Sequence, residues 1–226
     1  MRVLAIDTAL GACAAAVLDT AAGAIIAHES QAMQRGHAEA LMPLVKRVME
    51  SAGSTFADLD RIAVTTGPGS FTGLRVGIAA ARGLGLASGK PVVGLTTLAA
   101  YAAPLIAADD TLPVVAAIDA RHDNVYLQVF GPGGRTIVPP RLAPLREALR
   151  VAATGAPRLT GNAAEALAAI WPRAERLPTA VEQHAAPDID WVARLGAAAD
   201  ETAPPKPLYL RPPDAQPQEA GRLARR

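Results

Sequence analysis

The sequence predicts an α/β protein with two similar domains that lie side by side and leave a cleft between them. Three short apolar runs separated by turn residues begin each half of the chain, and such runs are typical of a strand meander. The triplets Ala5-Ile6-Asp7 and Ala117-Ile118-Asp119 head the two meanders. Helix and strand patterns alternate after each meander, so the order βββαβα occurs twice, less clearly the second time. An internal duplication explains this repeat, and two unrelated strands that end in aspartate are the alternative.

The first half, residues 1–106, is expected to form the N-terminal domain. Apolar residues recur at helical spacing between residues 36 and 52, which predicts an amphipathic helix. The other predicted elements of this half are strands at 3–8, 13–18, 24–27, 61–66 and 91–95, and helices at 72–87 and 96–106.

The second half, residues 107–211, is expected to form a shorter C-terminal domain. Residues 212–226 lack any periodicity, which predicts a disordered tail. The predicted elements of this half are strands at 114–118, 125–130 and 135–138, and helices at 145–152, 163–170 and 189–199 with short strands between them.

The composition indicates a globular protein of a reducing compartment, and we expect a cytoplasmic location. Half of the residues are hydrophobic, and the net charge of +1 is too small to imply binding to nucleic acid or membranes. The single cysteine, Cys13, cannot form an internal disulfide. The N-terminus imitates an export signal, but Asp7 interrupts its apolar run. Arg75 and Arg82 interrupt the longest apolar stretch, so no membrane span is predicted.

The segment Gly-Pro-Gly-Ser-Phe-Thr-Gly at 67–73, called the glycine-rich segment below, lies between a predicted strand and a predicted helix. Its glycines permit a tight turn, and the helix N-terminus offers unpaired N–H groups to an anion. A tight turn without a ligand is the alternative. The segment lacks the ending of a phosphate-binding P-loop, and Thr72 stands where the dinucleotide fingerprint needs glycine.

Small residues recur at every fourth position from the end of this segment, and we call them the small-residue ridge. Glycine costs about 1 kcal/mol relative to alanine inside a helix, so the pattern needs a reason. Small ridges let a neighbour approach closely. The sequence leaves open whether that neighbour is a partner's helix or the protein's own sheet or first helix. The ridge consists of Gly73, Gly77, Ala81 and Gly85.

A carboxylate ends the first strand of each half, Asp7 in the first and Asp119 in the second. At the end of a central strand, a carboxylate faces the cleft and could hold a water or Mg²⁺ near phosphates. A turn cap is the alternative. Together with the glycine-rich segment, these residues predict a vestigial nucleotide site. Its members are Asp7, Thr8, Gly67, Gly69, Ser70 and Asp119.

No metal site is expected. His37 would be the first member of a histidine pair one helical turn apart, but Leu41 occupies the second position. Cys13 alternates with alanines in a predicted strand, so a buried structural thiol is expected rather than a nucleophile.

Five segments, in order along most of the chain, resemble the bacterial TsaB (YeaZ) family. The glycine-rich segment with Leu74-Arg75 is the most specific of them. The resemblance implies the duplicated fold of actin-like ATPases (ribonuclease H-like, ASKHA). The five segments are Leu4-Ala5-Ile6-Asp7-Thr8, Gly36-His37-Ala38-Glu39 leading to Leu44, residues 67–75, Ala117-Ile118-Asp119-Ala120-Arg121 and Leu208-Tyr209-Leu210-Arg211.

The resemblance also implies a function. It suggests a non-catalytic dimerisation subunit of the complex that transfers a threonylcarbamoyl group to the adenosine beside the anticodon of tRNAs reading codons that begin with A. The implied partners are the paralogue TsaD, which carries a metal-binding His-x-x-x-His motif and the transferase site, and the ATPase TsaE. ATP and a metal are expected on these partners, and tRNA is expected to be contacted only through the complex. No cofactor, protease site or membrane contact is expected for this chain.

The family pairs its subunits through the first two helices of the N-terminal domain. A homodimer in isolation is one alternative to the heterodimer. A nucleotide-dependent small-molecule kinase of the same fold class, with Asp7 as metal or base residue, is the other. The interface implied by the resemblance comprises His37, Leu41, Met42, Val45, Met49, Gly73, Gly77, Ala81 and Gly85.

Overall fold

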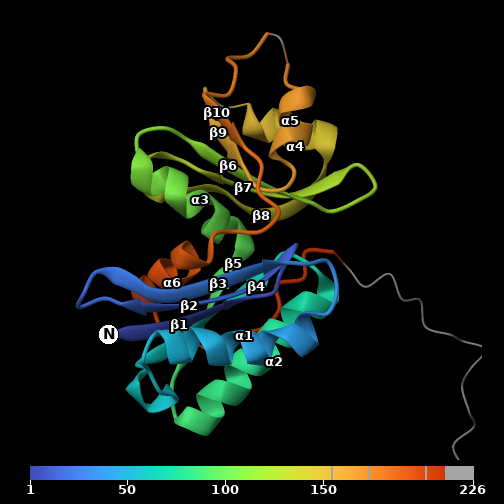
Figure 1. Ribbon diagram of the computed structural model, residues 1–226. Helices are drawn as coiled ribbons and strands as arrows, with labels where there is room; N and C mark the ends of the chain where they lie inside the picture. Colours follow the sequence, from blue (N-terminus) through green and yellow to red (C-terminus); the bar gives the residue numbers. More distant parts are fainter. Residues whose placement is uncertain (154, 173, 202, 212–226) are drawn as a thin grey trace, which may run out of the picture.

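The computed structural model describes residues 1–153, 155–172, 174–201 and 203–211 (Figure 1). The chain forms two five-stranded mixed sheets, one from each half. The disordered tail expected at 212–226 lies outside the described residues. Within the described part, no helix is both long and apolar enough to cross a lipid bilayer.

The first half contains the predicted βββαβα order followed by a further strand and helix. Its strands lie in the order β3-β2-β1-β4-β5, in which β2 is antiparallel to β1 and β3, and β4 is parallel to β1 and β5. The elements are β1 Arg2–Asp7, β2 Ala12–Asp19, β3 Ala24–Ala32, α1 His37–Ser51, η1 Phe56–Asp58, β4 Arg61–Gly67, α2 Phe71–Ser88, β5 Val92–Thr96 and α3 Thr97–Ala108.

The second half repeats this topology. Its strands lie in the order β10-β9-β6-β7-β8, which is the first sheet's order when each strand is replaced by its counterpart. The predicted fold class and the βββαβα order are therefore confirmed in both halves. The elements are β6 Val114–Asp119, β7 Asn124–Phe130, η2 Pro132–Gly134, β8 Thr136–Pro144, α4 Leu145–Ala152, β9 Arg158–Thr160, α5 Ala164–Ala169, β10 Ala180–Glu182 and α6 Ile189–Ala198.

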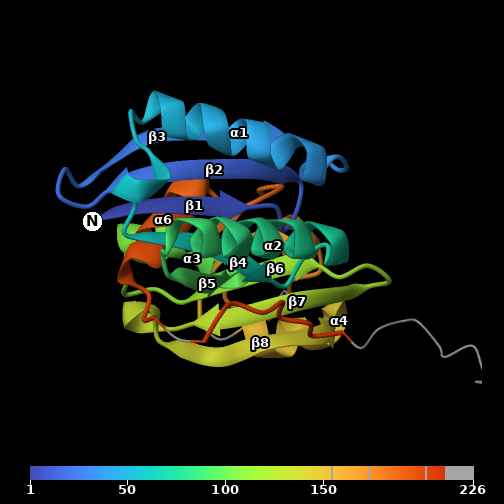
Figure 2. The same ribbon diagram turned by 90° about the horizontal axis from the view of Figure 1, so that it is seen from below.

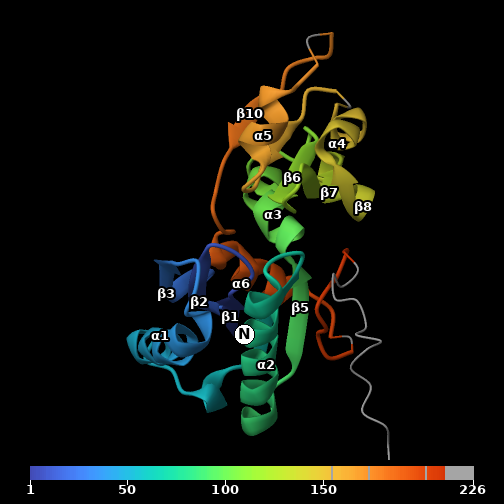
Figure 3. The same ribbon diagram turned by 90° about the vertical axis from the view of Figure 1, so that its right-hand side faces the viewer.

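The two halves exchange their last helices. α3 packs Leu98 and Tyr101 against β6 and β7 of the second sheet, whereas α6 packs Ile189 and Val192 against β1 and β2 of the first. Both helices therefore lie between the sheets (Figure 3). α1 and α2 lie side by side on the outer face of the first sheet (Figure 2), and α4 and α5 cover the outer face of the second. The division of the chain after residue 106, which falls within α3, stays a prediction.

Helices on both faces explain why the central strands are apolar throughout rather than alternating. Val3, Leu4, Ala5 and Ile6 of β1 are all fully buried. Each large aliphatic side chain buried in this way contributes about 1.5–3 kcal/mol. Cys13 in β2 is also buried, as expected, and this burial together with nearby carboxylates raises the pKa of its thiol to about 11.

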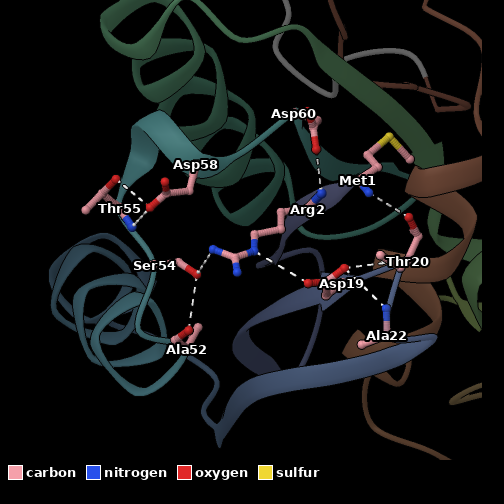
Figure 4. A network of polar contacts seen from close by, with 11 residues as sticks. Met1, Arg2, Asp19, Thr20, Ala22, Ala52, Ser54, Thr55, Asp58 and Asp60 are labelled. Atoms are coloured by element: carbon pink, nitrogen blue, oxygen red, sulfur yellow. Dashed lines mark hydrogen bonds and ion pairs between the residues drawn. The ribbon is translucent and has the colours of Figure 1, made fainter.

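The start of the chain is tied to the amino end of the first sheet by polar contacts (Figure 4). The N–H of Arg2 donates to Oδ2 of Asp60 at 2.6 Å. The Arg2 guanidinium donates to Oγ of Ser54 at 3.3 Å and lies 3.6 Å from Oδ2 of Asp19. Exposed ion pairs contribute only about 0–1 kcal/mol each to stability. The main effect of this network is therefore to hold the loops next to β1 in place.

Candidate functional site

A cleft of about 780 Å³ separates the two halves at the carboxyl ends of β1, β4, β6, β9 and β10. Open α/β sheets bind ligands at the carboxyl ends of their strands, so this cleft is the candidate site. The cleft is lined by Leu10, Gly11, Gln34, His37, Gly69, Ser70, Phe71, Thr72, Asp119, Ala120, Arg121, His122, Tyr126, Asn162, Gln183, Ala185 and Arg211.

The glycine-rich segment makes a tight turn from β4 into α2. Gly67 has a φ of +112°, which is readily accessible only to glycine. The N–H of Ser70 donates to the carbonyl oxygen of Ala9 at 2.7 Å, and a Cβ on Gly69 would overlap that same oxygen. Oγ of Ser70 caps α2 by accepting from the N–H of Gly73 at 3.3 Å. The glycines thus allow the segment to lie directly on the chain that follows β1.

Asp7 is wholly buried at the end of β1 and does not line the cleft. Its Oδ1 accepts hydrogen bonds from the hydroxyl of Thr65 and from the N–H of Ala9, whereas its Oδ2 has no partner in the described part of the chain. Burial raises the pKa of Asp7 above its ordinary value of 3.8, against the opposing effects of these hydrogen bonds and of His37. The expectation that this carboxylate faces the cleft is wrong, because the turn after β1 and the glycine-rich segment cover it.

Asp119, its counterpart in the second half, is exposed and lines the cleft. Its Oδ1 accepts from the N–H of Arg121 at 2.8 Å, and its own N–H donates to Oδ1 of Asn162 at 2.8 Å. Arg121, His122 and Asp123 all have positive φ angles, of 61°, 51° and 56°. Such angles are uncommon for residues other than glycine, and the sequence pattern gave no sign of this left-handed loop.

The predicted nucleotide-site residues thus fall into two groups, and the nucleotide site itself stays a prediction. Gly69, Ser70 and Asp119 line the cleft. The other members lie behind it, and the hydroxyl of Thr8 donates to the carbonyl oxygen of Gly73 at 2.7 Å. The members behind the cleft are Asp7, Thr8 and Gly67.

The small-residue ridge on α2 faces the protein's own first sheet. A Cβ on Gly73 would overlap the carbonyl oxygen of Thr8, and one on Gly77 would lie 2.5 Å from the hydroxyl oxygen of Thr8. A Cβ on Gly85 would overlap the side chain of Val92. The ridge therefore makes room for β1 and β5, and its assignment to a partner interface is wrong. The buried ridge positions are Gly73, Gly77, Ala81 and Gly85.

The α1 positions assigned to the interface are also mostly internal. Leu41, Val45 and Met49 belong to the core between α1 and the first sheet. His37 is buried as well, whereas the side chain of Met42 is 45% exposed. Among the α1 positions, the structure therefore leaves only Met42 available to a partner within the described residues.

Comparison with known proteins agrees with this architecture. The model of the family described as "TsaD: tRNA N6-adenosine threonylcarbamoyltransferase" matches residues 25–193. The "tRNA threonylcarbamoyladenosine biosynthesis protein TsaB" of Escherichia coli (strain K12) is 39% identical over 126 residues, which are 56% of this chain and 53% of that protein. The match therefore spans about half the length of that relative.

Two longer matches cover almost the whole chain. An uncharacterized protein of Mycobacterium tuberculosis (strain ATCC 25618 / H37Rv) is 38% identical over 217 residues, 95% of this chain and 94% of that protein. The solved structure of YeaZ from Pseudomonas aeruginosa has a TM-score of 0.78 at 28% identity and covers 92% of this chain and 99% of that one. The chain belongs to the TsaB/YeaZ family. The duplicated actin-like fold is confirmed with it.

In this TsaB/YeaZ family member, the surroundings of His37 are structural. Nε2 of His37 lies 3.1 Å from the carbonyl oxygen of Leu10, next to the turn after β1. Leu41, one helical turn further on, is packed in the core. Within the described ranges, no three His, Cys, Asp or Glu side chains are placed to bind a metal ion.

The outward face of α1 and α2 is the feature that sequence reasoning missed. Phe71 and Leu86 are 53% and 88% exposed, and with Met42 they place large apolar side chains on the surface of the two helices. A second helical stripe in the sequence of α2, distinct from the ridge, could have revealed this face, because a helix that is apolar on two sides is covered on two sides. This stripe consists of Val76, Ala79, Ala80, Gly83, Leu86 and Ala87.

Proposed function

We propose that this chain is the non-catalytic dimerisation subunit of the cytoplasmic complex that transfers a threonylcarbamoyl group to the adenosine beside the anticodon of tRNAs reading codons that begin with A. Membership of the TsaB/YeaZ family and the relatives named for tRNA threonylcarbamoyladenosine biosynthesis support the process. In this proposal tRNA is contacted through the complex, and ATP and a metal belong to the partners.

The second apolar stripe of α2, with Leu86 at its end, is the observation that carries the dimerisation role. Residues of this stripe are exposed or half-buried, although they repeat at the spacing of a packed helix face. The side chain of Leu86 is 88% exposed. Contiguous exposed apolar residues on a folded surface mark interaction sites.

A TsaD-type paralogue is the occupant that we propose for this face. The TsaD family model matches a segment that includes both α1 and α2, so such a partner carries the same two helices. Two similar helix pairs can pack ridge into groove as a four-helix layer. Charged residues surround the face, including Lys46 and Glu50 on α1 and Arg82 on α2, as at the polar rim of an interface. The ATPase TsaE completes the proposed assembly.

The non-catalytic part of the proposal is supported by the position of Asp7. A kinase of this fold would need a carboxylate that reaches the phosphates, and Asp7 is sealed beneath the turn after β1. Asp119 lines the cleft, where its Oδ1 accepts from the N–H of Arg121.

The decisive test replaces Leu86 by glutamate. The Leu86→Glu variant should fold normally, because the residue is exposed, and should bind a purified TsaD-type partner at least about tenfold more weakly, since a charge is buried in the interface. Leu177→Glu is the matched control, because Leu177 is 70% exposed on the second half. Affinity is measured by titration, and assembly by light scattering.

The transfer reaction provides the second readout. Purified components with wild-type chain should modify tRNA, and omission of the chain or use of Leu86→Glu should lower the rate. Undiminished transfer without the chain would refute the proposed role. If Leu86→Glu instead disrupts a homodimer of the isolated chain and pairs normally with the TsaD-type protein, the face serves self-association.

A further inference from the structure

The chain returns from α6 and runs along the first sheet beside β5 (Figure 3). The final described segment, residues 203–211, ends in Leu208-Tyr209-Leu210-Arg211, and the proposed function gives it no role. It joins the amino end of β4 to the mouth of the cleft, where Arg211 is one of the lining residues.

Arg61, the first residue of β4, holds the chain just before this segment. Its guanidinium donates to the carbonyl oxygens of Ala199 at 2.6 Å and Gly196 at 3.2 Å, and to Oε1 of Glu201 at 2.9 Å. Three bonds from one planar group fix the direction in which the chain leaves α6.

Gly94 in β5 forms a socket for the middle of the segment. A Cβ on Gly94 would lie 2.9 Å from the Cβ of Pro205, so only glycine lets Pro205 sit this close to the strand. Pro205 is buried there. Further on, the N–H of Leu208 donates to the carbonyl oxygen of Thr66 at 2.8 Å, at the carboxyl end of β4.

Tyr209 joins the end of the segment to α2. Its hydroxyl oxygen accepts from Nε of Arg75 at 3.0 Å. The Arg75 guanidinium lies 3.4 Å from the centroid of the Phe71 ring and 5.8 Å from that of Tyr209, and the two rings are 5.5 Å apart. The guanidinium therefore lies against the Phe71 ring and within range of the Tyr209 ring, and a cation near an aromatic ring is attracted to it. It ties the first turn of α2 to the last described residues of the chain.

We infer that residues 203–211 are a strap that positions the glycine-rich segment and the first turn of α2, and thereby the outward face of that helix. The anchors at Gly94, Thr66 and Arg75 lie on β5, β4 and α2, so the strap connects three elements around the turn at Gly67. Phe71 contacts Arg75 and Tyr209 and is the first residue of α2, the helix that carries the exposed face. The coupling to that face rests on the proposed function, whereas the positioning of the turn does not.

Hydrogen exchange of the isolated chain tests the positioning. Tyr209→Ala removes the stack and the hydroxyl acceptor, so peptides covering residues 67–75 should exchange at least about tenfold faster. Peptides covering residues 124–130 of the second sheet should be unchanged. Lys206→Ala is the control within the strap, because Lys206 is exposed, and it should leave both regions unchanged.

An unchanged rate at 67–75 in Tyr209→Ala would overturn the inference, and so would equal acceleration in both regions, which indicates general destabilisation. Tyr209→Phe keeps the ring and removes only the acceptor for Arg75, so its effect should be smaller but in the same region. This variant carries the test if Tyr209→Ala fails to fold.

Affinity for a purified TsaD-type protein tests the coupling. Tyr209→Ala should bind at least about threefold more weakly than wild type, because the interface must reorder the first turn of α2. Faster exchange at 67–75 with unchanged affinity would overturn the coupling. If the wild-type chain itself does not bind, the proposed function and the coupling fail together, while the exchange result still decides the positioning.

Discussion

Gly67 and Gly161 occupy the same place in the two halves. Gly67 is the last residue of β4, which pairs in parallel with β1, and Gly161 directly follows β9, which pairs in parallel with β6. Their φ angles are +112° and +106°. The carboxylates near the two turns nevertheless differ in burial: Asp7 is buried, whereas Asp119 is exposed to the cleft.

The difference arises in the connections that follow β1 and β6. After β1 the chain lies beneath the glycine-rich segment, where Ala9 accepts from the N–H of Ser70. After β6 the chain turns outward in the left-handed loop, which the N–H of Asn124 closes on the carbonyl oxygen of Arg121 at 3.1 Å. A repeat therefore shows where the fold places a residue, but the neighbouring turn decides whether that residue reaches solvent.

The two glycines should differ most in their tolerance of a side chain. Gly161→Ala should lower the free energy of unfolding by about 4 kcal/mol, because a strained φ is added to an overlap with the backbone oxygen of Ala117. Gly67→Ala should cost about 1–3 kcal/mol, since its nearest neighbour is the flexible end of Leu74, at 2.9 Å. Urea unfolding gives both values.

Gly23 serves as a control that measures the cost of a positive φ angle without any steric overlap. Gly23 has a φ of +66° with no atom within 4 Å of an added Cβ, so Gly23→Ala should cost about 1 kcal/mol. Equal costs for Gly161→Ala and Gly67→Ala would contradict the proposed difference between the two turns.

The two sides of α2 should respond oppositely to alanine. Gly77→Ala should destabilise the protein by about 1–3 kcal/mol, because the new methyl group would overlap the hydroxyl of Thr8 in the turn after β1. Gly83→Ala should stabilise it by about 0.5–1 kcal/mol, since nothing lies within 4 Å and alanine favours the helix. Thermal unfolding distinguishes the signs, and a stabilising Gly77→Ala would place the ridge outside the core.

Substitution of Asp7 should change how the stability of the protein depends on pH. Burial raises the pKa of Asp7 in the folded state, so its contribution to stability is present below about pH 4 and is lost as the pH rises through the folded value. Asp7→Asn should remove this loss, so the stability of the variant should rise relative to that of wild type between pH 4 and pH 7.

The slope of stability with pH is the readout, because the new amide also needs a hydrogen-bond partner. Asp119→Asn is the control, and this exposed substitution should change stability by less than about 0.5 kcal/mol at either pH. Parallel pH profiles for wild type and Asp7→Asn would show that Asp7 is not buried in solution.

The reactivity of Cys13 reports whether the turn after β1 stays closed, and the expected effect is the smallest of these predictions. Cys13 precedes Ala14, the residue of β2 that pairs with Asp7 of β1. Burial raises the pKa of this thiol to about 11, so wild-type protein should resist iodoacetamide at pH 8 and react fully only when unfolded. Gly67→Ala should increase the rate by a few-fold through local opening. Rapid labelling of wild type would indicate an open turn.

Much of the fold was predictable, because the central strands and the helices carry strong apolar patterns. The exceptions are edge strands. β3 continues to Ala32 and β8 to Pro144, beyond the apolar runs that predicted them, because the solvent-facing residues of an edge strand need not be apolar. Because these extensions are buried on one side at most, their sequences contain no continuous apolar run that would predict a strand.

The site was less predictable than the fold. The spacing of Gly73 and Gly77 correctly indicated a close approach, but spacing along one helix contains no information about which neighbour approaches. The repeat placed Asp7 and Asp119 at equivalent strand ends, and their burial depended on turns that no periodicity describes. The contacts of the strap were equally unpredictable, because the residues of β4, β5 and α2 that it touches lie far from it in the sequence.

The exchange of α3 and α6 constrains how the cleft can change its width. α3 follows β5 and packs on both sheets, whereas α6 follows β10 of the second sheet and packs on the first, and the two helices contact each other between the sheets. A wide rotation of one half would strip a helix from the sheet that it covers, whereas a small slide of α3 past α6 preserves both sets of contacts. Ala100 of α3 is buried in the same cluster as Val192 of α6, so a larger side chain at this position would disturb the packing of both helices.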